Sequence, residues 1–220
     1  MEMIAEKQVK ALSERTLRRL PRYIEILKRL KNEKIEFVSS NVIAEELGLD
    51  SIQVRKDLAA TGVIGKPKLG FAIDELISGI KHTLNWDNQT DAFLVGAGSL
   101  GSAILGYKTF SDHGLNIIAA FENEPSKVGE IINNITILPI EKLADMAFRM
   151  KVHIGVITVP IDQAQSVADM MIEGGIRAIW NFAPTHLKVP DFVIVENAQL
   201  SHSLGVLTHK LAESLKGEYK

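Results

Sequence analysis

The stretch Ala92-Phe-Leu-Val-Gly-Ala-Gly-Ser-Leu-Gly101 decides the fold of this 220-residue chain. Four apolar residues predict a buried strand, a glycine turn follows at once, and residues 102–107 are expected to continue as a helix. In this setting the first glycine makes the turn, the second lets the backbone approach a pyrophosphate, and the third permits close packing. The candidate dinucleotide contacts are Gly96, Ala97, Gly98, Ser99, Leu100 and Gly101.

A carboxylate ends the next predicted strand. Residues 117–121 are apolar, and Glu122 follows them where a carboxylate would accept hydrogen bonds from the adenine ribose hydroxyls. A carboxylate there repels a 2′-phosphate, and residues 123–125 offer no arginine to bind one. The sequence therefore favours NAD(H) over NADP(H).

Apolar strands and amphipathic helices alternate through the rest of the chain. We expect strands at 135–137, 153–159, 178–180 and 193–195, with helices at 140–150 and 163–173 between them. This alternation predicts a doubly wound parallel sheet, whose ligands bind beyond the carboxyl ends of the strands. That rule brings two further groups to the nicotinamide side: Thr158, Val159 and Pro160, and Asn181, Phe182, Ala183 and Pro184.

The charge of the chain is unevenly distributed. Residues 1–70 hold 14 Lys or Arg against 10 Asp or Glu, whereas the remaining 150 hold 11 against 17. This split indicates that only the first part approaches a polyanion, although a chance unevenness of solvated charges gives the same count.

Three helices are expected in that basic part. Ser13 is a candidate cap for the first, in which Pro21 marks either a kink or a later start. Residues 42–47 and 52–60 form two short helices around Gly48, which is the helix-turn-helix arrangement. In the last of them Ile52, Val54 and Leu58 supply a core side. Gln53, Arg55 and Lys56 carry side chains suited to bases and phosphates, unless they form only a solvated face.

Residues 62–71 follow this helix and carry glycine and proline around two lysines. They predict a short hairpin, or wing, that brings Lys66 and Lys68 to the DNA backbone or minor groove, with a plain basic loop as the alternative. A further helix is expected at 74–84, and residues 87–91 form a polar linker.

Composition excludes several classes of protein. The chain contains no cysteine, so disulfides, thiolate metal sites and cysteine nucleophiles are excluded, and we expect no metal site. No apolar run is long enough to span a bilayer and no signal peptide is evident, so a cytoplasmic protein is expected by default.

Several motifs occur in order along the chain: Ser13-Glu-Arg-Thr-Leu-Arg-Arg-Leu-Pro-Arg-Tyr23, Val38-Ser-Ser40, Gln53-Val-Arg-Lys-Asp-Leu58, Gly65-Lys-Pro67 with Gly70, the glycine loop, Ala119-Ala-Phe121, Thr158-Val-Pro160, Asn181-Phe-Ala-Pro184 and Val195-Glu-Asn197. Together they resemble the Rex family of redox-sensing transcriptional repressors. The resemblance implies a homodimer that binds an inverted-repeat operator in double-stranded DNA. NADH and NAD⁺ compete for its Rossmann domain, and NADH releases it from DNA.

The resemblance also implies site residues and domain boundaries. It adds Arg15, Ser40 and Ser51 to the DNA contacts and Tyr107 to the cofactor side. The expected α/β architecture is a winged helix-turn-helix domain at 1–85 and a Rossmann domain at 91–200. A C-terminal helix at 201–220 is exchanged between protomers, or packs on its own domain.

Five positions depart from the family pattern, and at one of them Phe71 replaces the usual tyrosine of the wing. Glu122 and Glu124 stand in place of aspartates, Gln199 replaces an aspartate thought to couple the cofactor to domain movement, and Glu25 replaces its arginine partner. The sequence leaves open whether Gln199 and Glu25 weaken or re-wire the response to NADH.

An enzyme is the rival class, namely an NAD-dependent oxidoreductase with a basic N-terminal extension. Such an enzyme needs a proton donor beside the nicotinamide. His113, His153, His186 and Tyr107 are the candidates, and none belongs to a recognisable constellation, so no catalytic residue is expected.

Overall fold

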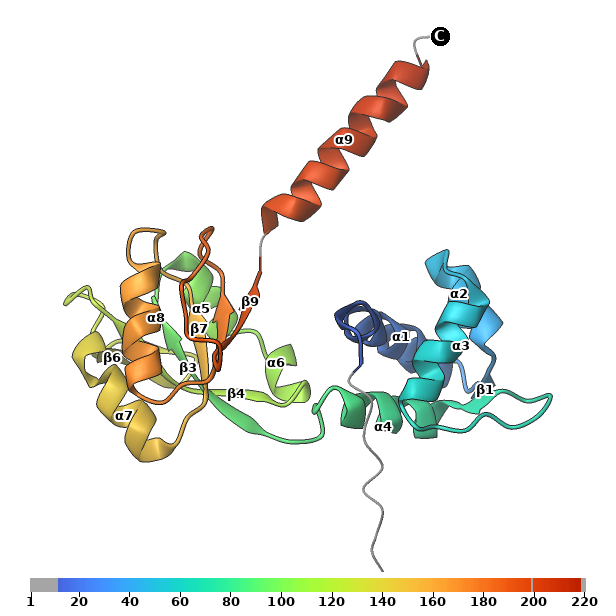
Figure 1. Ribbon diagram of the computed structural model, residues 1–220, viewed down its shortest axis with the longest axis horizontal. Helices are drawn as coiled ribbons and strands as arrows, with labels where there is room; N and C mark the ends of the chain where they lie inside the picture. Colours follow the sequence, from blue (N-terminus) through green and yellow to red (C-terminus); the bar gives the residue numbers. More distant parts are fainter. Residues whose placement is uncertain (1–11, 199, 219–220) are drawn as a thin grey trace, which may run out of the picture. The chain divides into compact units, whose positions relative to one another are not determined.

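The computed structural model describes residues 12–198 and 200–218, and the chain divides between Asn88 and Gln89 into two compact units (Figure 1). The division falls inside the polar stretch 87–91 that the sequence predicts to be a linker. We call residues 12–88 unit 1 and the remainder unit 2, and describe each by itself.

Unit 1 has four helices and two short strands among its described residues. They are α1 (Glu14–Asn32), β1 (Phe37–Val38), α2 (Ser40–Leu47), α3 (Ser51–Ala60), β2 (Phe71–Ala72) and α4 (Ile73–Thr83). One apolar core joins all four helices and β1.

Helix α1 begins where the sequence predicts and runs through Pro21. The Ser13 hydroxyl accepts a hydrogen bond from the Thr16 amide at 3.2 Å, which caps the first turn. Leu20 and Tyr23, on either side of Pro21, are fully buried, as is Leu27 further along. Because both halves of the helix are anchored in the core, tertiary packing outweighs the missing hydrogen bond of the proline.

Helices α2 and α3 are joined by a tight turn. Gly48 ends α2 in the left-handed conformation with φ 62°, and the Asp50 carboxylate accepts hydrogen bonds from the Ile52 and Gln53 amides at 2.7 and 3.1 Å. The cap and the glycine fix the start of α3 close to the end of α2, as the helix-turn-helix prediction requires.

The wing is shorter than predicted. Within residues 62–71 the only bridge is between Lys66 and Gly70, which exchange backbone hydrogen bonds, and Lys68 at the tip has φ 65°. Strand β2 pairs antiparallel with β1 instead of with residues 62–65. The hairpin is therefore a tight basic turn attached to a two-stranded sheet.

Unit 2 contains a seven-stranded sheet in the order β5-β6-β4-β3-β7-β8-β9. Its strands are β3 (Thr90–Val95), β4 (Leu115–Glu122), β5 (Ile131–Ile132), β6 (Ile135–Pro139), β7 (Ile154–Ile157), β8 (Ala178–Asn181) and β9 (Ile194–Asn197). All neighbours pair parallel except β5 and β6. The chain order reverses at β3, so the crevice beyond its carboxyl end is the expected ligand position.

Apolar helices cover both faces of this sheet. Phe93 and Val95 of β3 belong to one core with α7 (Leu143–Met150) and α8 (Ala164–Glu173). Leu94, whose side chain alternates to the other face, belongs to a second core with α5 (Ser99–Leu105) and α6 (Thr109–Asp112). The predicted doubly wound α/β fold is thus confirmed.

The sequence interpretation missed several small elements. Helix α6 and edge strand β5 were not predicted. The helix expected at 140–150 is a 3₁₀ turn, η1 (Ile140–Lys142), followed by α7, and α5 begins at Ser99 and ends before Tyr107. Asn133 and Asn134 connect β5 to β6 with positive φ angles of 49° and 66°, which suits a two-residue hairpin turn.

Helix α9 (Leu200–Glu218) presents apolar side chains that no part of the described chain covers. The exposed ones are Leu204, Val206, Leu207, Leu211 and Leu215. Among the described residues 12–198 and 200–218, no helix is both long and apolar enough to cross a membrane.

Candidate dinucleotide and nucleic-acid sites

The three motif glycines meet different surroundings. Gly96 has φ 102°, and a Cβ there would lie 2.8 Å from the Thr158 carbonyl oxygen. A Cβ at Gly101 would lie 1.9 Å from the Gly96 carbonyl oxygen, so Gly101 packs directly on the turn. A Cβ at Gly98 would meet nothing within 4 Å. The chain itself therefore gives no steric reason for glycine at 98, whereas close approach of a ligand does.

Glu122 is held firmly beside this turn. Its Oε2 accepts a hydrogen bond from the Ala97 amide at 2.8 Å, and its Oε1 accepts from the amides of Asn123 and Glu124 at 2.8 and 3.3 Å. These bonds fix the carboxylate at the end of β4, next to the glycine loop. Oε1 already accepts two hydrogen bonds, so the remaining acceptor capacity lies on Oε2, which is available to a ribose hydroxyl.

A cavity of about 310 Å³ opens at this edge of the sheet. Six of its lining residues were predicted from the sequence as cofactor contacts: Gly96, Gly98, Glu122, Thr158, Val159 and Pro160. The other four are Asn123, Glu124, Lys127 and Gln163. The Thr158 hydroxyl lies 2.9 and 2.8 Å from the Val95 and Gly96 carbonyl oxygens, to which it donates. Its side chain thus fastens the turn beside the cavity.

Asn181 is better described as a support than as a contact. Its side chain is fully buried and its Nδ2 lies within 2.9 Å of both the Thr185 carbonyl oxygen and the Asn197 Oδ1. Its Oδ1 accepts from the Ala183 amide at 3.0 Å. With these groups engaged, Asn181 holds the loop after β8.

Phe182 and Tyr107 lie outside the 310 Å³ cavity. Four rings form a continuous series from Tyr107 through Phe110 and Trp180 to Phe182, with centroids 4.8, 5.2 and 4.7 Å apart. Ala183 is buried and Pro184 is exposed. The structure thus brings the glycine loop, Glu122 and residues 158–160 together around one cavity, and leaves the group 181–184 beside the next strand.

The exposed face of α3 carries the predicted DNA-reading side chains. Gln53, Arg55 and Lys56 are exposed, and Val54 and Leu58 are fully buried, as the pattern predicts. Ile52 was assigned to the core side, but its side chain is 59% exposed. The prediction failed there because a ten-residue helix buries only a narrow stripe, and Ile52 lies outside it.

The wing and α1 contribute further cations. Lys66 and Lys68 are exposed, as is Arg15, and the Lys66 ammonium lies 5.1 Å from the centre of the Phe37 ring. Ile64, next to the wing, is 85% exposed. Exposed apolar side chains beside lysines suit the thymine methyl groups of a DNA groove.

Ser40 departs from this exposure. As the first residue of α2 it is only 6% exposed, so its side chain presents almost no surface to DNA. Ser51, the first residue of α3, is partly exposed.

A buried ionic cluster fastens α3 to α1. Asp57, with a side chain only 1% exposed, accepts hydrogen bonds from Arg19 Nε at 2.6 Å and Nη2 at 2.9 Å, and from the Tyr23 hydroxyl at 2.7 Å. The Thr16 hydroxyl and Gln53 Nε2 also donate to it, at 3.1 and 3.0 Å. Two helices far apart in sequence are thus locked, and Gln53 is oriented by the same carboxylate.

The cluster shifts the protonation of its members. Burial alone would raise the pKa of Asp57, but the hydrogen bonds from Arg19, Tyr23 and Gln53 and the Arg19 charge outweigh it and lower the pKa. Burial, followed by the hydrogen bond to Asp57, raises the pKa of Tyr23. Asp57 is therefore ionised and Tyr23 neutral over the ordinary pH range.

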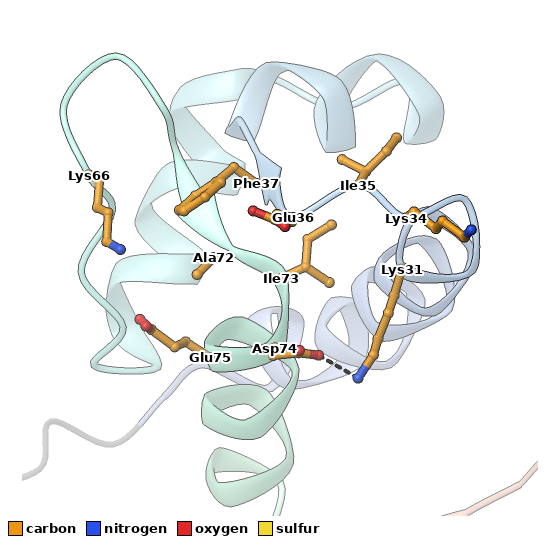
Figure 2. A pocket seen from close by; sticks show the side chains of 10 residues that line it. All are labelled: Lys31, Lys34, Ile35, Glu36, Phe37, Lys66, Ala72, Ile73, Asp74 and Glu75. Atoms are coloured by element: carbon orange, nitrogen blue, oxygen red, sulfur yellow. Dashed lines mark ion pairs between the residues drawn. The ribbon is translucent and has the colours of Figure 1, made fainter.

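A second cavity, of about 490 Å³, lies in unit 1. Figure 2 shows that its lining combines Lys31, Lys34 and Lys66 with Glu36, Asp74 and Glu75, and an ion pair of 2.6 Å joins Lys31 to Asp74. Because three lysines and three carboxylates line this cavity, their charges balance, and the cavity has no net positive charge that would favour an anion.

Sequence reasoning missed two sets of functional residues. The Asp57 cluster depends on pairing between α1 and α3, and Lys127 reaches the cavity from a loop position beyond residues 123–125. The one indication of Lys127 in the sequence is that it follows Glu122 closely along the chain. Within the described part of the chain, no cluster of His, Asp or Glu could hold a metal ion.

Two family profiles match the chain. "Putative DNA-binding protein N-terminus" covers residues 11–59, and "CoA binding domain" covers residues 87–185. The first spans α1 to α3, and the second begins before β3 and ends after β8.

Curated relatives match nearly the whole chain. It is 43% identical over 192 residues to the "Redox-sensing transcriptional repressor Rex" of Treponema denticola, covering 87% of this chain and 91% of that one. It is 40% identical over 208 residues to the protein of the same name from Bacteroides fragilis, covering 94% of both.

Solved structures agree in fold. The crystal structure of RSP, a Rex-family repressor, matches this chain with a TM-score of 0.86 and 34% identity, over 96% of this chain and 98% of that one. RSP in complex with NAD⁺ and operator DNA matches at 0.85 and 36% identity, and RSP with NADH at 0.86 and 35%; each match covers 96% of this chain and 100% of the other.

Proposed function

This chain belongs to the Rex family of redox-sensing transcriptional repressors, and on that premise we propose that it binds operator DNA through unit 1 and NADH or NAD⁺ through unit 2. The family consists of repressors and not of enzymes. NADH binding releases the DNA, so repression follows the ratio of NADH to NAD⁺.

One observation carries this proposal. The chain combines helix α3, which exposes polar side chains, with a glycine loop that leaves open space beside Gly98. Its relative RSP has been crystallised with both operator DNA and NAD⁺. A sensor needs two ligand sites, and each unit offers one of them.

The cofactor lies across the carboxyl end of β3. Gly96, Gly98 and Gly101, with Ala97, Ser99 and Leu100, surround its pyrophosphate, and Glu122 accepts its ribose hydroxyls. Residues 158–160 line the cavity beside it. The half-buried Phe182 and the exposed Pro184 extend an apolar surface toward the nicotinamide, which favours the neutral reduced ring over the oxidised cation.

The DNA is contacted by α3, the wing and the start of α1. Arg55 and Lys56 carry the recognition chemistry, Gln53 is oriented by Asp57, and Ser51 lies at the start of the reading helix. Lys66, Lys68 and Arg15 meet phosphates, and the buried Ser40 acts through the position of α2.

The protein acts as a homodimer. The five exposed apolar residues of α9 would cost free energy in water and are covered by a second copy of the chain, with α9 exchanged between protomers. Sedimentation equilibrium should give twice the 24.3 kDa of one chain, and a monomer at micromolar concentration would contradict this part. Gln199, which precedes α9, lies outside the described residues, and Glu25 is exposed on α1.

Replacing Arg55 by alanine tests the DNA site. The variant should lose about 5- to 150-fold in affinity for an inverted-repeat duplex selected from random sequence, because a bidentate arginine contact to guanine is removed. Fluorescence anisotropy of the labelled duplex measures the loss.

The matched control is Arg149→Ala, which removes an exposed arginine from α7 in unit 2. It should change operator affinity by less than about twofold, since exposed ion pairs contribute little. Equal losses in the two variants, or none in Arg55→Ala, would show that α3 does not read the operator.

A further inference from the structure

Three charged side chains line the 310 Å³ cavity beside the glycine loop: Glu122, Glu124 and Lys127. Lys127 is the one cation among its described lining residues. Two carboxylates and one ammonium leave this end of the cavity with a net negative charge.

Glu122 cannot move away from an incoming group. The backbone amides of Ala97, Asn123 and Glu124 hold its two oxygens, and its side chain is only 13% exposed. A ribose with free hydroxyls donates to such a carboxylate, whereas a 2′-phosphate would meet it as a like charge.

Lys127 is already occupied by Glu124. The distance from its Nζ to Glu124 Oε2 is 2.9 Å, and the distance to Glu122 Oε2 is 3.9 Å. Glu124 is held from the other side as well, because the Ser126 hydroxyl donates to its Oε1 at 2.7 Å. The hydrogen bond from Ser126, followed by that from Lys127, lowers the pKa of Glu124, so this carboxylate stays charged at neutral pH.

A phosphate on the ribose needs an unpaired cation in this position. A lysine ammonium binds phosphate well as a point charge, but here its charge is matched before any ligand arrives. Glu124 therefore competes directly with a 2′-phosphate for Lys127, while Glu122 repels that phosphate from a fixed position.

We propose that Glu124, by holding Lys127, sets the preference of this cavity for a dinucleotide with an unmodified adenosine ribose over one with a 2′-phosphate. The inference rests on the proposed function, since it concerns the same cofactor site. It assigns a selectivity role to two residues of the loop after β4, in addition to the ribose carboxylate Glu122.

The test compares NADH with NADPH by the fluorescence of their reduced nicotinamides. Glu124→Gln keeps the size of the side chain and removes its charge, so it should raise the affinity for NADPH relative to NADH about tenfold. Lys127→Gln should lower that ratio. In the double variant the gain from Glu124→Gln should disappear, because it depends on a freed ammonium.

A matched control separates this pairing from a general change in charge. Glu173→Gln removes one exposed carboxylate at the end of α8, away from the residues that line the cavity, and should leave the ratio unchanged. The inference is wrong if Glu124→Gln leaves the ratio unchanged, if Glu173→Gln raises it equally, or if the gain persists without Lys127.

Failure of the inference is distinguishable from failure of the proposed function. If wild-type protein binds NADH and the ratio does not respond to Glu124, only the selectivity mechanism is overturned. If wild-type protein binds neither dinucleotide at millimolar concentration, the cofactor site itself is wrong and the inference falls with it.

Discussion

Replacing Gly98 by valine is expected to weaken NADH binding by about 10- to 100-fold, the effect of forcing a branched side chain into close-packed space. The backbone at 98 is extended, with φ −73°, and the space before it is empty in the free chain. The bound pyrophosphate would occupy that space. Titration of NADH fluorescence measures the change.

The same emptiness makes the variant a clean one. Since a Cβ at 98 meets nothing within 4 Å, Gly98→Val should fold normally and bind operator DNA with wild-type affinity. Gly101→Val is the contrasting variant, because its Cβ would lie 1.9 Å from the Gly96 carbonyl and should unfold the turn. Wild-type affinity of Gly98→Val for NADH would mean that the glycine loop does not hold the cofactor.

Replacing Asp57 by alanine should lower the free energy of unfolding of unit 1 by about 3 kcal/mol, the low end of the cost of breaking a buried ion pair. The low end applies because the Arg19 side chain is 20% exposed and regains some hydration. The Tyr23 hydroxyl also loses its acceptor. Hydrogen exchange of the α1 and α3 amides separates this loss from the stability of unit 2.

Operator affinity should fall together with stability, because Asp57 fixes the angle of α3 and the amide of Gln53. Glu45→Ala, at an exposed position of α2, is the control and should change neither quantity appreciably. If Asp57→Ala unfolded at the same denaturant concentration as wild type, the cluster would not be what joins the helices.

The same carboxylate gives a dependence on pH. Because the pKa of Asp57 is lower in the folded chain than in the unfolded one, its contribution is fully present above about pH 4. The contribution of Asp57 to the free energy of unfolding is lost as the pH falls toward the pKa of the folded chain, because Asp57 of the unfolded chain binds a proton at a higher pH. Asp57→Asn should lack this acid-side loss.

The fold could be predicted largely because its signals are local. Ser13 caps the helix that the sequence assigns to it, and the alternation of apolar strands with helices specifies the parallel sheet. Pro21 could not be resolved in advance, because the packing of Leu20 and Tyr23 decides whether the helix continues. That packing is tertiary.

The sites were harder to predict than the elements. Gly96, Gly98 and Glu122 lie together because the glycine loop follows β3 and Glu122 ends the neighbouring strand β4. This arrangement could be predicted from the glycine motif. Asn181 has the chemistry of a ligand contact, but its buried bonds to Thr185 and Asn197 give it a structural role. Lys127 and Asp57 act through partners distant in sequence or in an irregular loop, so no periodic pattern reveals them.

We propose that NADH and operator DNA oppose one another through two states of the proposed homodimer. By thermodynamic reciprocity, operator DNA must weaken NADH binding by the same factor by which NADH weakens operator binding. The factor should correspond to about 1–3 kcal/mol, nearer the lower value if Glu25 and Gln199 lack the charge pair of the family.

The most direct measurement is the dissociation constant of NADH with and without a saturating concentration of operator duplex. We expect NADH to bind about 5- to 150-fold more weakly in the presence of the duplex, and we expect no such change with Arg55→Ala at the same duplex concentration. An NADH dissociation constant that is identical with and without operator would contradict the sensor mechanism, however tightly each ligand binds alone.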